Sequence, residues 1–129
     1  MPLTTAGRNF IATAIVNSGP PTFFDAADAN IGVGDSSTAF DVAQTDLQAA
    51  TNKLRKGMDA TYPTIATNLL TFRSTFSTAE ANFHWQEWGI FNAGPTGGTM
   101  LSRKAEDLGT KTSAQSWQIT AAITVSIGS

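Results

Sequence analysis

The sequence predicts a mainly β protein, an antiparallel β-sandwich or small barrel with one short N-terminal helix. Three observations predict this fold class. Apolar residues recur at helical spacing near the N-terminus, they alternate with polar residues from Lys53 onward, and short turns separate the alternating segments. Several strands joined by short turns favour an antiparallel sheet over β-α-β units. The 129 residues are expected to form one domain, with a helix at about 5–17 and a β-rich part at about 29–128.

The helix is predicted from the segment TTAGRNFIATAIVNSGPP. Thr4 or Thr5 can cap its first turn, and the Ser-Gly-Pro-Pro run at 18–21 ends it. Four apolar residues fall on one face at helical spacing: Phe10, Ile11, Ala14 and Ile15. The helix therefore has one apolar stripe to bury, against its own sheet or against a neighbour.

The first strands are expected to be short. A strand is predicted around residues 31–33, followed by a Gly-Asp-Ser turn, and residues 37–54 are expected to form a loop with one helical turn near 46–50. The segment 53–66 predicts a strand interrupted at Pro63. Because proline cannot donate a hydrogen bond to a sheet, this strand is expected at an edge or a bulge.

The later strands alternate more clearly. The segment NLLTFRSTFS predicts a half-buried antiparallel strand, and two more strands are predicted in NFHWQEWGIFN and TMLSRKAED, joined by the turn GPTGG. The final segment alternates from Trp117 to Ile127 and predicts a strand of about a dozen residues with one buried face. The residues predicted for the core of these strands are Phe72, Phe76, Trp85, Trp88, Phe91, Trp117, Ile119, Ile123 and Val125.

Composition argues against several classes of function. A net charge of −2 and a pI near 5.1 give no overall field to attract nucleic acid or an anionic membrane, so neither partner is expected. Without cysteine the chain has no disulfide, thiolate metal site or cysteine nucleophile, which suits a reducing cytoplasm. We expect no secretion signal and no membrane-spanning segment, because no basic start precedes a long apolar run.

The side chains that could carry catalysis are few. His84 is the only histidine, and on a strand it faces away from Glu87, three residues along. One histidine without cysteine leaves only carboxylates to complete a zinc site. A glycosidase-like pair needs a second carboxylate at a defined separation from Glu87, and the spacing of the other acidic residues selects none. We therefore expect Glu87 to pair with an arginine or a backbone amide. No enzyme activity, catalytic residue, cofactor or metal ligand is predicted.

The tryptophans and one glycine-rich turn are the candidate binding motifs. Trp85, Trp88 and Trp117 could form a stacking platform for sugars or bases. On a regular strand Trp85 and Trp88 face opposite ways, so a joint platform needs a bulge, and burial of at least two of the three is expected. The turn IGVGDSS lacks the spacing of a phosphate loop, and its Asp35 and Ser36 would bind calcium only with further oxygen ligands.

Charge is unevenly distributed along the chain. A stretch without basic residues contains five aspartates: Asp25, Asp28, Asp35, Asp41 and Asp46. Lys53, Arg55 and Lys56 follow closely. An acidic loop beside a basic strand suits electrostatic docking between copies or onto a partner, and two solvated faces explain the same pattern equally well.

The order of four segments resembles small structural proteins of tailed bacteriophages. These segments are TTAGRNFIATAI, IGVGDSSTAF, LTFRSTFSTAEANFHWQEWGIFNAGPTGGTMLSRKA and KTSAQSWQITAAITVSIG. The central block is similar to the N-terminal region of tail-collar fibre proteins, whose pattern includes a VGDG-like turn, a TFxATF…EAN…WxEWGLF block and a GGxMLxR hairpin. The resemblance covers almost the whole chain, and its specificity lies in the order of the motifs.

The resemblance implies a virion-structural β domain without enzyme activity, in which Trp85 and residues 88–91 belong to a packed strand and residues 94–98 form a turn. A tail-collar fibre continues into a shaft and a receptor-binding tip, whereas this chain ends where the β domain ends, so a long fibre by itself is not expected. The favoured function is a capsid decoration or cement protein bound to the particle in many copies. The alternatives are a tail-collar or baseplate attachment protein and a glycan-binding module on the virion surface.

The expected partners are further copies of the chain, with a trimer favoured, and a phage capsid or tail protein; a host glycan is left open as a ligand. The protein is expected in the virion, after synthesis and assembly in the cytoplasm of a bacterial host. The residues predicted for docking are Leu3, Arg8, Phe10, Asp35, Asp41, Arg55 and Lys56.

Overall fold

The structure of the chain is a computed structural model that describes residues 2–19 and 21–126. Within these residues one helix, α1 (Thr5–Ile15), precedes seven strands. The strands are β1 (Asn30–Gly34), β2 (Lys53–Gly57), β3 (Thr64–Ala66), β4 (Leu69–Phe76), β5 (His84–Phe91), β6 (Met100–Thr110) and β7 (Trp117–Thr124). The helix is too short to cross a membrane, and the described residues contain no helix long and apolar enough to do so.

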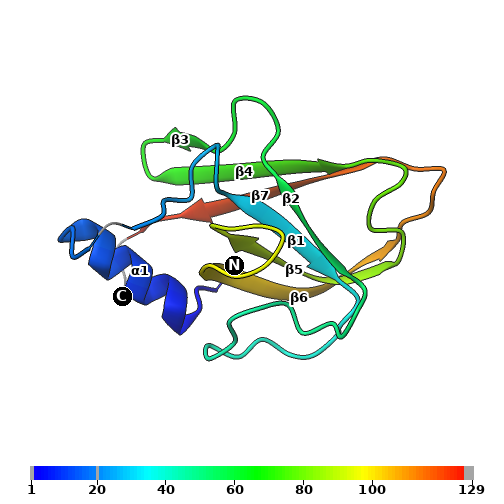
Figure 1. Cartoon of the computed structure of the whole chain (residues 1–129), viewed down its shortest axis with the longest axis horizontal. Coiled ribbons are helices and arrows are strands. Elements are labelled where there is room, and N and C mark those ends of the chain that lie inside the picture. The colour runs from blue at the N-terminus through cyan, green and yellow to red at the C-terminus, as the bar shows by residue number, and fades with distance from the viewer. Residues whose placement is uncertain (1, 20, 127–129) are drawn as a thin grey trace.

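The strands form two antiparallel sheets that face one another (Figure 1). One sheet has the order β2-β1-β5-β6, and the other has the order β3-β4-β7. The predicted fold class is confirmed: in the described residues the sheets are not closed into a barrel, so the architecture is a sandwich with one short helix.

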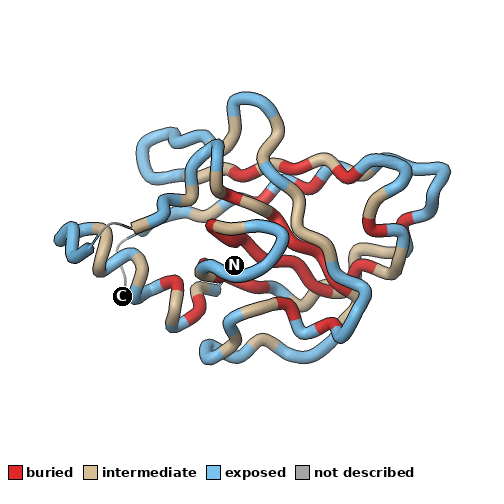
Figure 2. Tube along the Cα trace, viewed as in Figure 1, coloured by how far each residue is buried: buried red, intermediate tan, exposed pale blue. Residues whose placement is uncertain are grey.

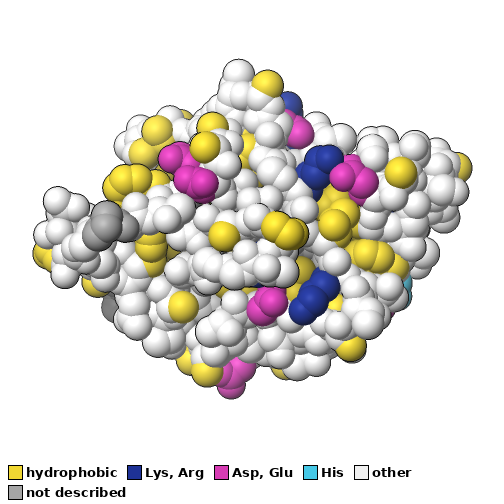
Figure 3. All heavy atoms as spheres, viewed as in Figure 1, with side chains coloured by type: hydrophobic (Ala, Val, Ile, Leu, Met, Phe, Trp, Pro, Cys, Tyr) yellow, Lys and Arg dark blue, Asp and Glu magenta, His cyan; other side chains and the backbone are white. Residues whose placement is uncertain are grey.

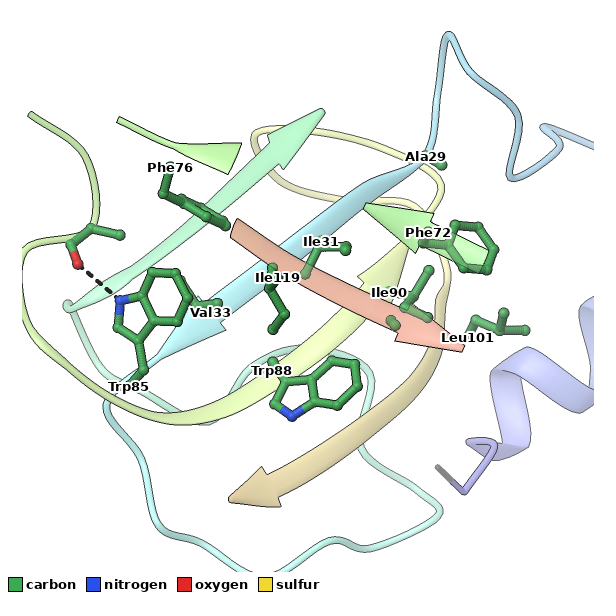
Figure 4. Packing of buried hydrophobic residues seen from close by; sticks show 12 residues of the cluster. Ala29, Ile31, Val33, Phe72, Phe76, Trp85, Trp88, Ile90, Leu101 and Ile119 are labelled. Carbon is green, nitrogen blue, oxygen red and sulfur yellow. Dashed lines mark hydrogen bonds between the residues drawn. The ribbon is translucent and has the colours of Figure 1, made fainter. Parts of the chain in front are cut away.

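The core lies between the two sheets, and Figure 2 shows the buried segments running along their facing strands. The four-stranded sheet contributes Ile31, Val33 and Ile90, which are 0% exposed. Phe76 of β4 packs edge-on against Trp85 of β5 at 5.0 Å between ring centroids. The indole Nε1–H of Trp85 donates to the carbonyl of Ala81 at 2.9 Å, so this large side chain is buried with its polar atom satisfied (Figure 4).

Of the nine residues predicted for the core, six are buried: Phe72, Phe76, Trp85, Trp88, Phe91 and Ile119. Trp117 and Ile123 are partly buried and pack against the same cluster. Val125 does not belong to the core, because β7 ends at Thr124 and the Val125 side chain is 61% exposed. Ile127, the last residue of the predicted alternation, lies outside the described residues.

An irregularity in β5 and β6 explains how two tryptophans three residues apart share one core. The ladder pairs Trp85 with Gly109 but Glu87 with Ala105, so the register shifts between these two positions. Strict alternation would place Trp85 and Trp88 on opposite faces, and the shift breaks it. Both tryptophans therefore lie between the sheets, while Glu87 faces the other side of its sheet, with the loop that covers it.

The outer face of the four-stranded sheet is covered by residues 35–52, which form the covering loop. Leu47 of this loop packs with Phe91 and Met100 in a second buried cluster. A Cβ at Gly34 would collide with the Glu87 carboxylate, so glycine is needed where the loop and its partner approach the strand. The helical turn predicted near residues 46–50 is absent, because the Gln48 and Ala49 amides donate to the Glu87 carboxylate instead of to carbonyls of their own segment.

Residues 53–66 form two strands rather than one interrupted strand. β2 pairs with β1 in the four-stranded sheet, whereas β3 pairs with β4 in the other sheet. Pro63 lies just before β3, where the chain passes from one sheet to the other. The prediction that this region is at an edge holds for both strands, since β2 and β3 each have a single neighbour.

The helix is attached to the sandwich through its first turn. Thr4 is the N-cap, and its hydroxyl accepts the Gly7 amide at 2.8 Å and donates to the Met100 carbonyl at 2.6 Å. The Thr5 amide donates to the Val42 carbonyl of the covering loop at 2.8 Å. The helix ends at Ile15, two residues before its predicted end, and its second half extends beyond the sheets (Figure 1).

Gly7 permits the close approach of α1 to β6, since a Cβ at this position would collide with the Leu101 carbonyl. Alanine normally stabilises a helix relative to glycine by about 1 kcal/mol. We predict the opposite sign here: Gly7→Ala should lower the free energy of unfolding by about 1–3 kcal/mol, because the helix must shift away from β6. Asn9→Ala, at an exposed position of the same helix, is the control and should be neutral or slightly stabilising. Urea denaturation measures both, and an increase in stability for Gly7→Ala would contradict the packing described.

Candidate interaction surface

Glu87 of β5 and Arg103 of β6 form a fully buried ion pair beneath the covering loop. The Arg103 Nε–H donates to Glu87 Oε1 at 2.8 Å, and both side chains are 0% exposed. The amides of Gln48 and Ala49 donate to the two Glu87 carboxylate oxygens at 2.7 and 2.8 Å. The expectation that Glu87 pairs with an arginine or a backbone amide is confirmed for both kinds of partner. Its carboxylate has no access to solvent and holds the loop in place.

The guanidinium group of Arg103 completes this arrangement. Its two terminal nitrogens donate to the Gln44 side-chain oxygen at 3.1 Å and to the Thr38 carbonyl at 2.9 Å. Hydrogen bonds to loop backbone at both ends of the pair compensate the cost of burying two charges. The pair therefore fixes the path of the covering loop over a sheet whose glycines leave room for it.

We predict that Glu87→Gln lowers the free energy of unfolding by about 3–5 kcal/mol, because it leaves the buried Arg103 charge without a counter-charge. The matched control is Asp107→Asn, which removes a carboxylate from the solvent-exposed pair with His84 on the same two strands. This control should leave the urea midpoint unchanged. Equal midpoints for Glu87→Gln and the parent chain would show that the buried pair does not hold the loop.

His84 pairs with Asp107 rather than with Glu87. The His84 Nε2 lies 2.7 Å from Asp107 Oδ1, and this hydrogen bond, together with the Gly109 amide, lowers the pKa of the Asp107 carboxyl below its ordinary value. Both side chains are exposed. His84 and Glu87 are thus held by different partners, although the register shift between Trp85 and Glu87 removes the alternation from which opposite faces were predicted.

The tryptophans are held by the core. Trp85 and Trp88 are 2% and 9% exposed, and Trp117 is half-buried with its ring edge-on to Trp85 at 5.0 Å. At least two of the three were expected to be buried, and this expectation is confirmed. A glycan-stacking role for Trp85 or Trp88 would require opening of the sandwich.

The basic residues predicted for docking are used inside the chain. The Arg55 side chain is only 5% exposed, lies over the Phe91 ring at 3.7 Å and donates to Asp46 at 3.1 Å and to the Ala93 carbonyl at 2.9 Å. The side chain is packed between the covering loop and the turn after β5 and so presents little surface to a partner. Lys56 forms an ion pair with Glu80 at 2.8 Å, and this contact lowers the pKa of Glu80 to about 2.

The other residues predicted for docking are dispersed. Asp35 accepts a hydrogen bond from Asn52, and Asp41 is exposed on the covering loop, where it accepts the Ala43 amide. Arg8 is exposed on the helix. Leu3 and Phe10 do come together, since both line the same groove beside α1.

Exposed large hydrophobic side chains occur around a groove where α1, β3 and the end of β7 meet, at the end of the molecule on the left of Figure 1. We call this surface the apolar end, and its members are Ile11, Ile15, Val16, Phe23, Ile65 and Val125. Five of them are more than half exposed. Among the described residues two exposed large hydrophobic side chains lie outside this group: Val42 on the covering loop, and Leu69, which points to the other face of its sheet from the groove-lining Leu70. Figure 3 shows hydrophobic side chains at the surface on this side of the molecule.

A groove of about 640 Å³ runs through the apolar end. Its walls include Phe10 and Ile11 of α1, Phe23, Ile65 of β3 and Ile123 of β7. None of the described residues that line it carries a charge. The groove therefore offers apolar contact without electrostatic selection, which is typical of surfaces that bind other proteins.

A second, polar cleft of about 1050 Å³ lies along α1. Asn9, Asn30 and Asn92 contribute amides to its lining. The Asn92 amide is already bonded to the Thr22 carbonyl at 2.8 Å and to the Thr99 amide at 2.7 Å, so it holds the surrounding loops together. The helix thus has a hollow beside it on the polar side as well as on the apolar side, and Phe10, packed edge-on against Phe24 at 4.9 Å, lines both.

Sequence reasoning found the helical stripe but not the rest of the apolar end. Ile65 was visible only as part of an interrupted strand, and Val125 was assigned to the core because it continues an alternation that the strand itself does not follow. The sequence feature that could have indicated this surface is Pro63, which interrupts the predicted strand and so predicts that the residues after it lie at a sheet edge. Comparison with known proteins adds no family: no protein-family model and no curated protein matches the chain.

Proposed function

We propose that the chain is a non-enzymatic structural component of a tailed-phage virion, most specifically a capsid decoration or cement protein that binds the particle in many copies. The observation that carries this proposal is the apolar end, where six large hydrophobic side chains remain exposed. Contiguous apolar surface of this kind marks a site of contact with another macromolecule. The order of the sequence motifs resembles that of phage structural proteins, and for this reason we propose a tailed-phage virion as the particle.

The placement of the chemically capable side chains also favours function by contact. Glu87 is enclosed by Arg103 and two backbone amides, and Trp85 and Trp88 are part of the core. These groups stabilise the sandwich and the covering loop. The exposed surface that has no packing partner within the described residues consists of apolar side chains rather than of chemically reactive ones.

A decoration protein acts by adding many small contacts. A rigid sandwich can occupy each of many equivalent positions on an icosahedral shell. If its apolar end links neighbouring copies, their contacts with the shell reinforce one another without any single contact being strong. Reinforcement of this kind raises the force or temperature at which a shell ruptures. In this proposal the chain is made in the bacterial cytoplasm and functions on the assembled virion.

Attachment to the tail is the alternative, in keeping with the similarity of the central block to tail-collar fibre proteins. In that role the domain would be a platform that joins larger tail parts. The same apolar contact serves either role, so the position on the particle separates them.

The test is binding of the purified chain to capsids that lack tails and, in parallel, to isolated tails. We predict saturable binding to tailless capsids and a higher temperature of capsid rupture when the sites are full. Binding to tails with no binding to capsids would assign the chain to tail attachment instead. Binding to neither would contradict a virion-structural role, provided that the chain is shown to be folded by circular dichroism.

A further inference from the structure

We infer that the apolar end is the surface through which copies of this chain bind one another, with the exposed half of α1 from one copy packing against the apolar groove of the next. This inference rests on the proposed function, because binding of many copies to one particle is what brings the copies next to one another. The occupant of the groove is a second copy of the same chain.

The size of the apolar end fits an interface between copies. Its six side chains expose on the order of 650 Å² in total, if a free side chain of this size has roughly 150–200 Å² of surface. The largest apolar patch on an ordinary monomer is about 300–600 Å², and a standard interface buries about 800 Å² on each partner. The apolar end alone therefore supplies most of the area that a stable dimer needs.

The shape of the apolar end makes it complementary to itself. Ile15 and Val16, 78% and 71% exposed, stand at the far end of α1, beyond the sheets. The groove beside the helix is hollow and apolar, with Ile65 on its far wall at 72% exposure. One face thus carries both a ridge and a groove, so each copy can insert its ridge into the groove of another, either reciprocally in a two-fold dimer or head to tail in a closed ring such as a trimer.

Electrostatics permits this pairing. Because none of the described residues lining the groove is charged, association brings no like charges together inside it. The net charge of −2 gives only weak repulsion between copies. Within its own chain α1 is held by its first turn and by the contact of Phe10 with Phe24, so its second half is free to contact a neighbour.

The experiment is sedimentation velocity of the parent chain and three variants over a wide range of concentration. Ile15→Glu changes the ridge, Ile65→Glu changes the far wall of the groove, and Val42→Glu changes an exposed hydrophobic side chain outside the apolar end. Glutamate favours a helix at least as well as isoleucine, so Ile15→Glu should fold normally. We predict a closed oligomer, a dimer or a trimer, for the parent and for Val42→Glu. Self-association should be at least about tenfold weaker for Ile15→Glu and Ile65→Glu.

Two results would overturn the inference: a parent chain that stays monomeric at all concentrations, or an oligomer that both apolar-end variants retain. The same proteins are then added to tailless capsids. A monomeric parent whose capsid binding is lost in Ile15→Glu would assign the apolar end to the particle, which overturns the inference and leaves the proposed function intact. If the parent forms an oligomer that both variants lose, but the parent binds neither capsids nor tails, the result would support the inference and contradict the proposed function.

Discussion

The buried contact between Glu87 and Arg103 is the interaction on which the rest of the structure depends. It holds the covering loop against a sheet face that glycines keep open, with the loop amides of Gln48 and Ala49 bound to the same carboxylate. The loop in turn accepts the Thr5 amide at the Val42 carbonyl, so the loop fixes the start of the helix together with β6, to which Thr4 is bonded. The buried Glu87–Arg103 pair therefore helps to position α1 and the apolar stripe that this helix carries.

This dependence gives the molecule two unlike parts. The central strands β1 and β5 of the four-stranded sheet are buried between the other sheet and the covering loop, and they provide a rigid body. At the end where the helix leaves that body, apolar side chains from α1, β3 and β7 remain exposed. A rigid body with one unsatisfied end is suited to repeated assembly, and this is the physical basis of both the proposed virion role and the proposed contact between copies.

The sequence was informative where local pattern decides structure. Alternation identified β4 with Phe72 and Phe76 inward, and Thr4 was one of the two residues expected to cap the helix. It was uninformative where distant segments meet: nothing local shows that residues 48 and 49 donate to Glu87, or that Arg55 lies over Phe91. The prediction that Val125 belongs to the core was wrong for the opposite reason: the alternation in the sequence continues after the pairing of β7 with β4 has ended. The apolar end combines both problems, because it joins three segments that are far apart in the chain.

The most direct test of the central claim is hydrogen–deuterium exchange of the chain, free at low concentration and bound at saturation to purified particles. If the apolar end is the assembly surface, exchange should slow in the second half of α1, in β3 and at the end of β7 when the chain is assembled. Unchanged exchange in these segments, with protection confined to the covering loop or to the outer face of the β3-β4-β7 sheet, would contradict the account.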